Sequence, residues 1–356
     1  MTWHNVRGHD RVVEQFRSAL ARRRMASTFL FVGPPGIGKR TFALRLAQAL
    51  LCEQRSDEQL DPCERCPACL QVAALTHPDV ELLKRPEDKA FIPVELLIGD
   101  KEHRMREGLC YNISLKPYSG RRKIAIIDDA DYLNKEGANC LLKTLEEPPP
   151  KSIMILIGTS EQRQLPTIRS RCQVVRFQAL AEQDLAELLV EHGVCTEIGE
   201  ALRAAALGKG SFAHAVQAAD PQFSEFRGQL LELLSQREFE LLAAAKMVSQ
   251  FVDDAGKEAP AKRARLKEVV AVAADFYRQL LHALGGAGAS ADPVLDRAVL
   301  AAQQWWSGDE ATVAACLEHC LDALGHIEAN VGQATVIEWW LDELATISRT
   351  GSPTAV

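Results

Sequence analysis

The feature that most constrains the fold of this chain is the stretch Gly33–Thr41, which reads GPPGIGKRT. It follows a short apolar run, residues 28–32, and leads into a helical pattern that starts at Phe42. A strand, a glycine-rich turn and a helix in this order form a phosphate-binding loop, whose backbone N–H groups and helix dipole face phosphate oxygens. The nucleotide-binding residues expected in this loop are Gly33, Gly36, Gly38, Lys39 and Thr41.

One position of the loop departs from the usual pattern. The residue after the lysine is normally Ser or Thr, whose hydroxyl holds magnesium. Here it is Arg40, and the hydroxyl of Thr41 comes one place later. The loop therefore predicts that ATP or ADP binds through the charge of Lys39. It argues against an ordinary Mg²⁺ site, unless a shift of the loop by one residue lets Thr41 take over the metal contact.

A second nucleotide motif follows the apolar run 124–127, where Asp128 and Asp129 come next. In phosphate-loop NTPases the first carboxylate holds the magnesium shell, and the next, normally Glu, polarises the attacking water. Because Asp129 is one methylene shorter than Glu, we expect weakened water activation. The alternative is an acidic turn after a buried strand. A later apolar run ends at Thr159 and Ser160, which we expect as nucleotide contacts at the same edge of the sheet.

The order of strand and helix patterns predicts three domains. Strands alternate with helices through residues 1–178, which predicts an α/β domain with a parallel sheet and helices on both faces. Within it, 93–109 reads as a helix. Strand patterns disappear from residue 180 onward, which predicts a small helical domain over 179–219. A second helical domain over 220–356 is interrupted by the glycine-rich stretch 285–289.

Four cysteines form a candidate metal module over residues 52–69. Cys63, Cys66 and Cys69 have the spacing C-x2-C-x2-C, and Cys52 lies eleven residues upstream. Four thiolates suit a tetrahedral Zn²⁺ ion, and a closed four-cysteine site is structural rather than catalytic. An iron–sulfur cluster and unliganded cysteines remain as alternatives.

Two groups in the C-terminal half fit core packing better than chemistry. Cys316, His319 and Cys320 share a helix face, but no fourth ligand accompanies them, so we interpret them as core positions. The tryptophan pairs 305–306 and 339–340 are likewise predicted to pack in the core rather than to stack on bases.

Charge and hydropathy limit the partners and the location of the chain. The net charge of −7 argues against a bulk electrostatic grip on nucleic acid, although Arg121–Lys123 and Arg169 form local basic patches. No run approaches the roughly 18 apolar residues of a membrane span, and the N-terminus lacks the apolar core of a signal peptide. We therefore expect a cytoplasmic protein without a membrane partner, in which the ten cysteines are reduced or metal-bound.

Four motifs together resemble a known family. They are the loop Gly33–Lys39, the cysteine module, Lys143–Pro149 (KTLEEPP) and Ser170–Cys172 (SRC), in that order. This set resembles the bacterial clamp-loader subunits of DNA polymerase III, which are AAA+ ATPases, and it covers about the first 215 residues. The resemblance implies that 179–219 is a lid domain and 220–356 a collar domain for oligomerisation. The implied partners are gamma/tau and delta subunits in a five-subunit ring, with the sliding clamp and primer-template DNA reached through that assembly.

Within this family, the departures favour one type of subunit. Gamma/tau is the motor that hydrolyses ATP, whereas delta-prime largely does not. The motor also has a Gly-Ser-x-Arg motif in its second domain, and the matching stretch here, Gly210–Ala213, ends in alanine. With Arg40 and Asp129, this makes three weakened catalytic positions, and the sequence stops at residue 356 without the long extension of tau. The chain therefore resembles delta-prime. A motor subunit and a scaffold without nucleotide are the alternatives.

The resemblance also assigns a role to Arg171 in the Ser-Arg-Cys motif. It looks like the arginine finger of the family, which points across a subunit interface into the ATP site of a neighbour. A guanidinium stays charged and donates bidentate hydrogen bonds to a phosphoryl group. The other interpretation is that Arg171 pairs with a carboxylate of its own domain.

Overall fold

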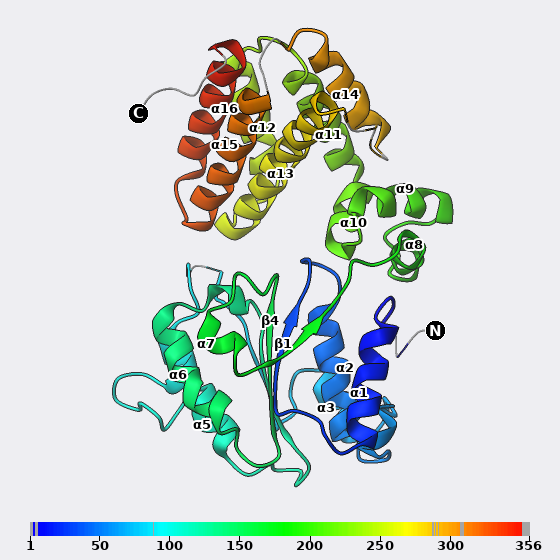
Figure 1. Cartoon of the computed structure of the whole chain (residues 1–356), viewed down its shortest axis with the longest axis vertical. Coiled ribbons are helices and arrows are strands. Elements are labelled where there is room, and N and C mark those ends of the chain that lie inside the picture. Colours follow the sequence, from blue (N-terminus) through cyan, green and yellow to red (C-terminus); the bar gives the residue numbers. More distant parts are fainter. Residues whose placement is uncertain are drawn as a thin grey trace. The chain divides into compact units, whose positions relative to one another are not determined.

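A computed structural model of the chain describes residues 3, 6–87, 89–286, 288, 290, 292–306 and 310–350. The chain divides into two compact units, Met1–Val216 and Gln217–Val356 (Figure 1).

The first unit is built on a five-stranded parallel sheet with the strand order β2-β3-β4-β1-β5. All seven residues of the central strand β4 are buried, as expected of a parallel sheet covered on both faces. In the register of the sheet, Thr28 of β1 lies opposite Met154 of β4, and Lys123 of β3 lies opposite Ser152. The strands are β1 Thr28–Val32, β2 Val80–Leu83, β3 Lys123–Ile127, β4 Ser152–Gly158 and β5 Gln173–Arg176.

Helices cover both faces of this sheet, as the sequence predicts. Figure 1 shows α1–α3 on one side and α5–α7 on the other. Because side chains alternate along β1, Phe29 and Phe31 face the first group, where their rings lie 5.1 Å from Phe16 and 5.9 Å from Phe42. Leu30 faces the second group and belongs to its separate apolar cluster. The helices are α1 Asp10–Ala21, α2 Lys39–Leu51, α3 Pro67–Ala73, α4 Val94–Ile98, α5 Leu109–Ser114, α6 Lys135–Glu146 and α7 Pro166–Arg169.

The predicted helix over 93–109 is wrong. Helix α4 ends at Ile98 because Gly99 has a φ of +82°, and α5 starts only after Gly108, whose φ is +86°. A Cβ atom on Gly108 would lie 2.7 Å from the Gly99 nitrogen, so the two glycines close a tight, irregular segment between two short helices.

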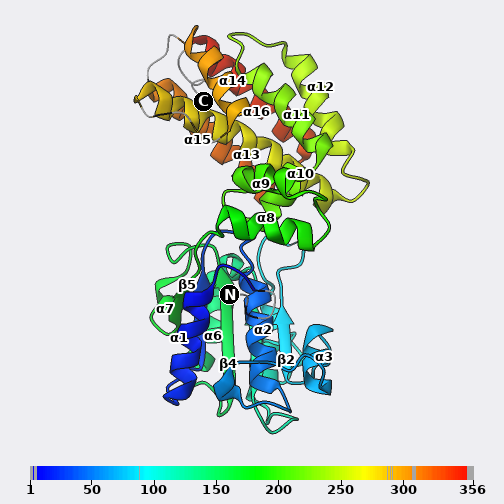
Figure 2. The ribbon, with the colours of Figure 1, turned by 90° about the vertical axis from the view of Figure 1, so that its right-hand side faces the viewer.

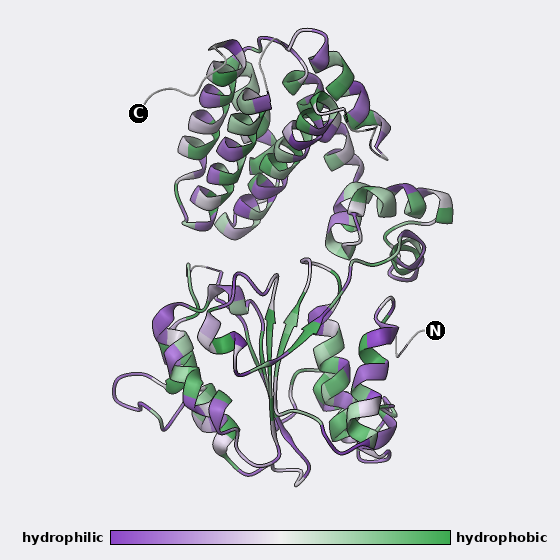
Figure 3. Cartoon of the chain, in the orientation of Figure 1, coloured by the Kyte–Doolittle hydropathy of each residue, from purple (hydrophilic) through white to green (hydrophobic). Residues whose placement is uncertain are grey.

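Three helices complete the first unit after the sheet. They are α8 Glu182–Glu191, α9 Ile198–Gly208 and α10 Phe212–Ala219, whose last residues cross the unit boundary. As the sequence predicts, no described residue after Arg176 lies in a strand. The hydropathy colouring in Figure 3 shows apolar residues concentrated in the strands, with polar residues on the outer helix faces.

The second unit is helical throughout its described residues. Helix α13 packs against α11, α14 and α15 (Figure 2). Its core contains the fully buried Phe276 and Trp340. The helices are α11 Pro221–Leu234, α12 Leu241–Asp253, α13 Ala259–Leu284, α14 Pro293–Gln303, α15 Glu310–Glu328 and α16 Gln333–Thr350. The predicted interruption at 285–289 follows the end of α13, although residues 287 and 289 lie outside the described ones.

The packing interpretation is confirmed for Cys316, His319, Cys320, Trp306 and Trp340, which are buried, whereas Trp305 is half-buried and Trp339 is 38% exposed, so the prediction of a core position is wrong for Trp339. Cys316 and Cys320 are buried, and His319 lies 3.2 Å from the carbonyl of Trp340 through Nε2. The indole nitrogen of Trp340 donates to the sulfur of Cys320, and that of Trp305 donates to a backbone carbonyl. Of the helices described, none has the length and hydropathy needed to cross a membrane.

Candidate functional site

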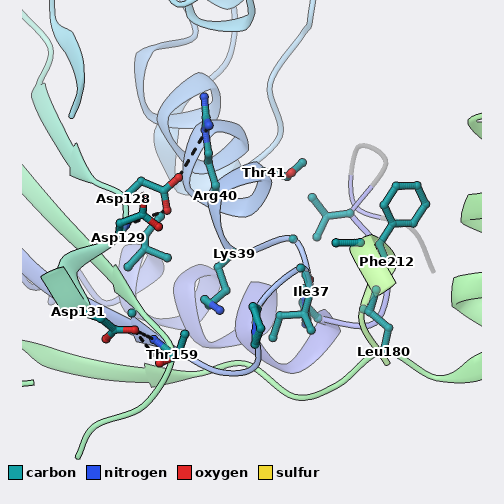
Figure 4. A pocket seen from close by; sticks show the side chains of 18 of the residues that line it. Ile37, Lys39, Arg40, Thr41, Asp128, Asp129, Asp131, Thr159, Leu180 and Phe212 are labelled. Carbon is teal, nitrogen blue, oxygen red and sulfur yellow. Dashed lines mark hydrogen bonds and ion pairs between the residues drawn. The ribbon is translucent and has the colours of Figure 1, made fainter. Parts of the chain in front are cut away.

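The motifs meet at the carboxyl edge of the sheet. Strands β3, β4 and β1 are neighbours, so the residues that follow them, Asp128, Thr159 and the loop Gly33–Thr41, share one edge. A pocket of about 560 Å³ lies there. Figure 4 shows it lined by the loop, by the acidic residues after β3 and by Leu180 and Phe212 from the helical region that follows the sheet.

The loop has the backbone of a phosphate-binding loop, with its lysine folded inward. Gly36 and Gly38 have φ values of +71° and +90°. The ammonium group of Lys39 donates to the carbonyls of Gly33 at 2.5 Å and Pro34 at 2.6 Å. Burial lowers the pKa of Lys39 to about 8, against the opposing effect of nearby carboxylates. The cation is thus held inside the loop, close to where a phosphate would bind.

The residue after this lysine is Arg40, which stands where a metal-binding hydroxyl is expected. Its side chain pairs with a carboxylate instead. The guanidinium of Arg40 lies 3.8 Å from the carboxylate of Asp128 and forms an ion pair with it (Figure 4). Thr41 lines the pocket, but Figure 4 places it apart from the aspartates. Magnesium needs oxygen ligands around it, and here a fixed positive charge stands against the carboxylate that would hold the ion. These residues do not fit the magnesium ion of the family.

The charged form of the second carboxylate, Asp129, is disfavoured in this position. Burial, followed by the charge of Asp128, raises the pKa of Asp129 above its usual value. Its backbone also has a left-handed conformation, with a φ of +60°.

A third carboxylate, Asp131, has a structural role that the sequence reasoning missed. It accepts hydrogen bonds from the backbone N–H of Thr159 at 2.8 Å, from the Thr159 hydroxyl at 2.6 Å and from the side-chain amide of Gln164. The hydroxyl of Thr159 therefore donates to Asp131 instead of to a ligand in the pocket. Ser160 accepts a hydrogen bond from the N–H of Arg163 and does not line the pocket. The aspartates after β3 indicated a functional edge of the sheet. The sequence alone does not show that Asp131 is the one that accepts hydrogen bonds from residues after β4.

The small helical region contacts the loop directly. The N–H of Phe212 donates to the carbonyl of Gly36 at 2.9 Å, and a Cβ atom on Gly36 would lie 2.3 Å from the Ser211 hydroxyl oxygen. Ala213, at the position where the motor motif has arginine, lines the pocket without supplying a charge.

His9 supports the loop from the N-terminal side and was also missed by the sequence reasoning. It is buried, and its Nε2 donates to the carbonyl of Ile37 at 2.7 Å. Burial lowers the pKa of His9, which favours the neutral form of the ring.

Arg171 lies outside the pocket, at the end of α7. It donates from Nε to a carboxylate oxygen of Glu146 at 2.7 Å and from Nη1 to the carbonyl of Thr167 at 3.0 Å. Its side chain is 30% exposed. Because Glu146 belongs to the Lys143–Pro149 motif, the two signature motifs of the sequence meet in this ion pair.

The four cysteines of the candidate metal module come together. The sulfur atoms of Cys52, Cys63, Cys66 and Cys69 all lie within 4.8 Å of one another. Backbone N–H groups donate to them, from Cys63 to the Cys52 sulfur at 3.4 Å and from Cys66 to the Cys63 sulfur at 3.3 Å. A tetrahedral Zn²⁺ with about 2.3 Å bonds requires sulfur–sulfur separations of about 3.8 Å. The cluster fits such an ion, and all ten cysteines of the chain are free of disulfides.

Comparison with known proteins shows which proteins this chain resembles in sequence. Residues 8–181 match the family model described as DNA polymerase III, delta subunit. The chain is 31% identical to DNA polymerase III subunit delta' of Bacillus subtilis over 63% of each chain. It is 36% identical to subunit delta' of Pseudomonas aeruginosa over 42% of this chain and 43% of that one. It is 29% identical to subunit tau/gamma of Haemophilus influenzae over 62% of this chain and 30% of that one.

The parallel sheet, with a glycine-rich loop at its carboxyl edge that leads into a helix, is the arrangement of a phosphate-loop nucleotide-binding domain. In sequence, the chain is similar to the clamp-loader subunits of DNA polymerase III, and these matches support a subunit most like delta′. It spans about two fifths to just under two thirds of the length of these delta′ relatives.

Proposed function

We propose that this protein is a delta′-type subunit of a bacterial replicative clamp loader. In this role it assembles with gamma/tau and delta subunits in a ring of five, and the assembly places the sliding clamp on primed DNA. The proposal is supported by the match over residues 8–181 and by relatives named as delta′ and tau/gamma subunits of DNA polymerase III.

The single observation that favours delta′ over the motor subunit is the Arg40–Asp128 ion pair. Hydrolysis in phosphate-loop NTPases needs a metal ion between a loop hydroxyl and this carboxylate. Here an arginine replaces the hydroxyl and neutralises the carboxylate, and Ala213 replaces the arginine of the motor motif. The raised pKa of Asp129 further weakens it as a water-activating group. We therefore assign this chain little or no ATPase activity of its own.

In the assembled loader, Arg171 is the arginine finger directed at the ATP site of a neighbouring subunit. Its partial exposure and its position at the end of a short helix support this role. The Glu146 pair holds the guanidinium in the isolated chain, and the phosphates of a neighbour would compete with this carboxylate for the same donors. Fingers of this kind contribute about 10³–10⁵ in rate in related NTPases.

The cysteine module holds a structural zinc ion. Four cysteine sulfurs within 4.8 Å of one another and backbone N–H groups directed at them support this assignment. Since α3 packs against α2, the ion would fix the helix that begins in the phosphate loop.

The test is to reconstitute the loader with its gamma/tau and delta subunits and to measure DNA-stimulated ATPase activity. Arg171→Ala should leave assembly intact and lower this activity at least tenfold, a cautious fraction of the range for such fingers. The control is Arg17→Ala, at an exposed arginine of α1 outside the basic patches, which should retain activity. An unchanged rate with Arg171→Ala would refute the finger, and failure of the wild-type chain to assemble would refute the clamp-loader role.

A further inference from the structure

The pocket contains fixed positive charges where the family has a metal ion. Lys39, Arg40 and Arg163 line it, together with Asp128, Asp129 and Asp131. Arg7 also lines the pocket, but Glu187 and Glu191 of α8 hold its guanidinium. Because Thr159 and Gln164 occupy both oxygens of Asp131, that carboxylate has less capacity for a further cation.

We propose that this pocket binds nucleoside di- and triphosphates as metal-free anions, with the guanidinium of Arg40 in place of the magnesium ion. The inference rests on the proposed delta′-type role and extends it to the nucleotide binding that the sequence predicts for the loop. Magnesium then weakens binding instead of supporting it.

The geometry of Arg40 carries this argument. A guanidinium has five donors in a planar fork, so it bonds one carboxylate and still has donors for a phosphate. Its distance of 3.8 Å from Asp128 places it beside the pocket with 41% of its side chain exposed, and therefore accessible to a ligand. A bound polyphosphate would bridge Lys39 and Arg40, which are adjacent at the start of α2. The N-terminus of that helix contributes its partial positive charge to the same anion.

Magnesium acts against each of these contacts. It requires near-octahedral oxygen coordination at about 2.0–2.1 Å. An ion at Asp128 would lie close to a guanidinium of the same sign and would lack the hydroxyl ligand. Chelation also removes two units of negative charge from the nucleotide, which reduces its attraction to Lys39 and Arg40. The metal-bound nucleotide is therefore the weaker ligand.

The test is equilibrium binding of fluorescently labelled ADP and ATP to the full chain, in excess EDTA and in excess Mg²⁺. The wild type should bind more tightly in EDTA than in Mg²⁺. Arg40→Ser, which restores the hydroxyl and removes the cation, should lose about tenfold in EDTA and bind more tightly when Mg²⁺ is added. Arg40→Lys keeps the charge and should keep the wild-type preference for metal-free nucleotide. Arg17→Ser, on the exposed surface of α1, is the matched control and should behave as wild type.

Each outcome has a defined meaning once circular dichroism and zinc content show that the variants are folded. Binding by the wild type that is as tight in Mg²⁺ as in EDTA, or tighter, overturns the inference, as does no binding in either condition. An Arg40→Ser variant with the wild-type metal response also overturns it. Assembly with gamma/tau and delta subunits is measured on the same samples, so a failure of the nucleotide inference is distinguished from a failure of the proposed clamp-loader role.

Discussion

Asp131 and Asp129 are two residues apart, yet their replacement should have opposite effects on the stability of the first unit. Asp131 accepts three hydrogen bonds that join the end of β3 to the residues after β4. Asp129 is a partly buried carboxylate whose pKa is raised by burial and by neighbouring negative charges. The first should stabilise the fold as an anion, whereas the second should be destabilised by its own charge.

The magnitudes follow from the partners of each group. Hydrogen bonds to a charged acceptor contribute about 1.5–3 kcal/mol each, and a buried donor left without a partner costs about 1–3 kcal/mol. Gln164 is only 4% exposed, so its amide has little access to water as a replacement. Since water reaches part of this half-buried site, we expect Asp131→Ala to cost about 3–5 kcal/mol. Asp131→Asn, which retains one carbonyl acceptor, should cost about 1–2 kcal/mol.

The sign for Asp129 is worked out from its raised pKa. A carboxyl whose folded pKa lies above its unfolded value destabilises the fold at pH values where it is ionised. Asp129→Asn removes that charge and should leave the free energy of unfolding unchanged or raise it by up to about 1 kcal/mol. Native-state hydrogen exchange reports this separately for each unit. Peptides from β1, β3 and β4 should lose protection in Asp131→Ala, while peptides from α13 in the second unit should not change. Equal effects of Asp131→Ala and Asp129→Asn would refute the reasoning.

Three further predictions concern the metal module, the aromatic core and the loop support. Thiol modification of the purified protein should release about one zinc ion per chain. Cys66→Ser should abolish this release, whereas Cys195→Ser, at a buried cysteine outside the module, should not. A wild-type protein without zinc would contradict the metal module. Phe42→Ala, at a fully buried ring between Phe16 and Phe31, should lower the stability of the first unit by about 3–5 kcal/mol in the same exchange assay, and a loss below about 1 kcal/mol would contradict the packing argument. Because burial lowers the pKa of His9, protonation favours the unfolded chain, and the free energy of unfolding should fall as the pH decreases from about 7 to about 5. The His9→Gln variant should lose less stability over this interval. An identical pH profile in the two proteins would show that His9 does not contribute.

The sequence predicted the parts of the site that depend on local pattern. The strand before the loop, the glycines at positive φ and the acidic pair after β3 each follow from a few consecutive residues, and the structure places all of them at one sheet edge. The cysteine spacing likewise predicted a cluster, because two C-x2-C turns bring sulfur atoms together wherever the chain permits.

The sequence did not predict contacts between side chains that are far apart in the chain. The partner of Arg171 is Glu146, 25 residues away, and that of Asp131 is Thr159, 28 residues away. Arg40 was recognised as the loss of a hydroxyl, but its pairing with Asp128 depends on the three-dimensional register of β1 and β3 across β4. The helix predicted over 93–109 failed for a different reason. Gly99 and Gly108 adopt positive φ values, and apolar periodicity alone gave no indication of this.

We infer that this chain is a clamp-loader subunit that does not hydrolyse ATP by itself. The most direct test is magnesium-dependent ATP hydrolysis by the purified full chain, with its zinc content and fold checked on the same sample. We expect no ATP turnover above background, because Arg40 pairs with Asp128 and replaces the metal-binding hydroxyl. Robust hydrolysis that Lys39→Ala abolishes would contradict the account and would identify the chain as a motor subunit.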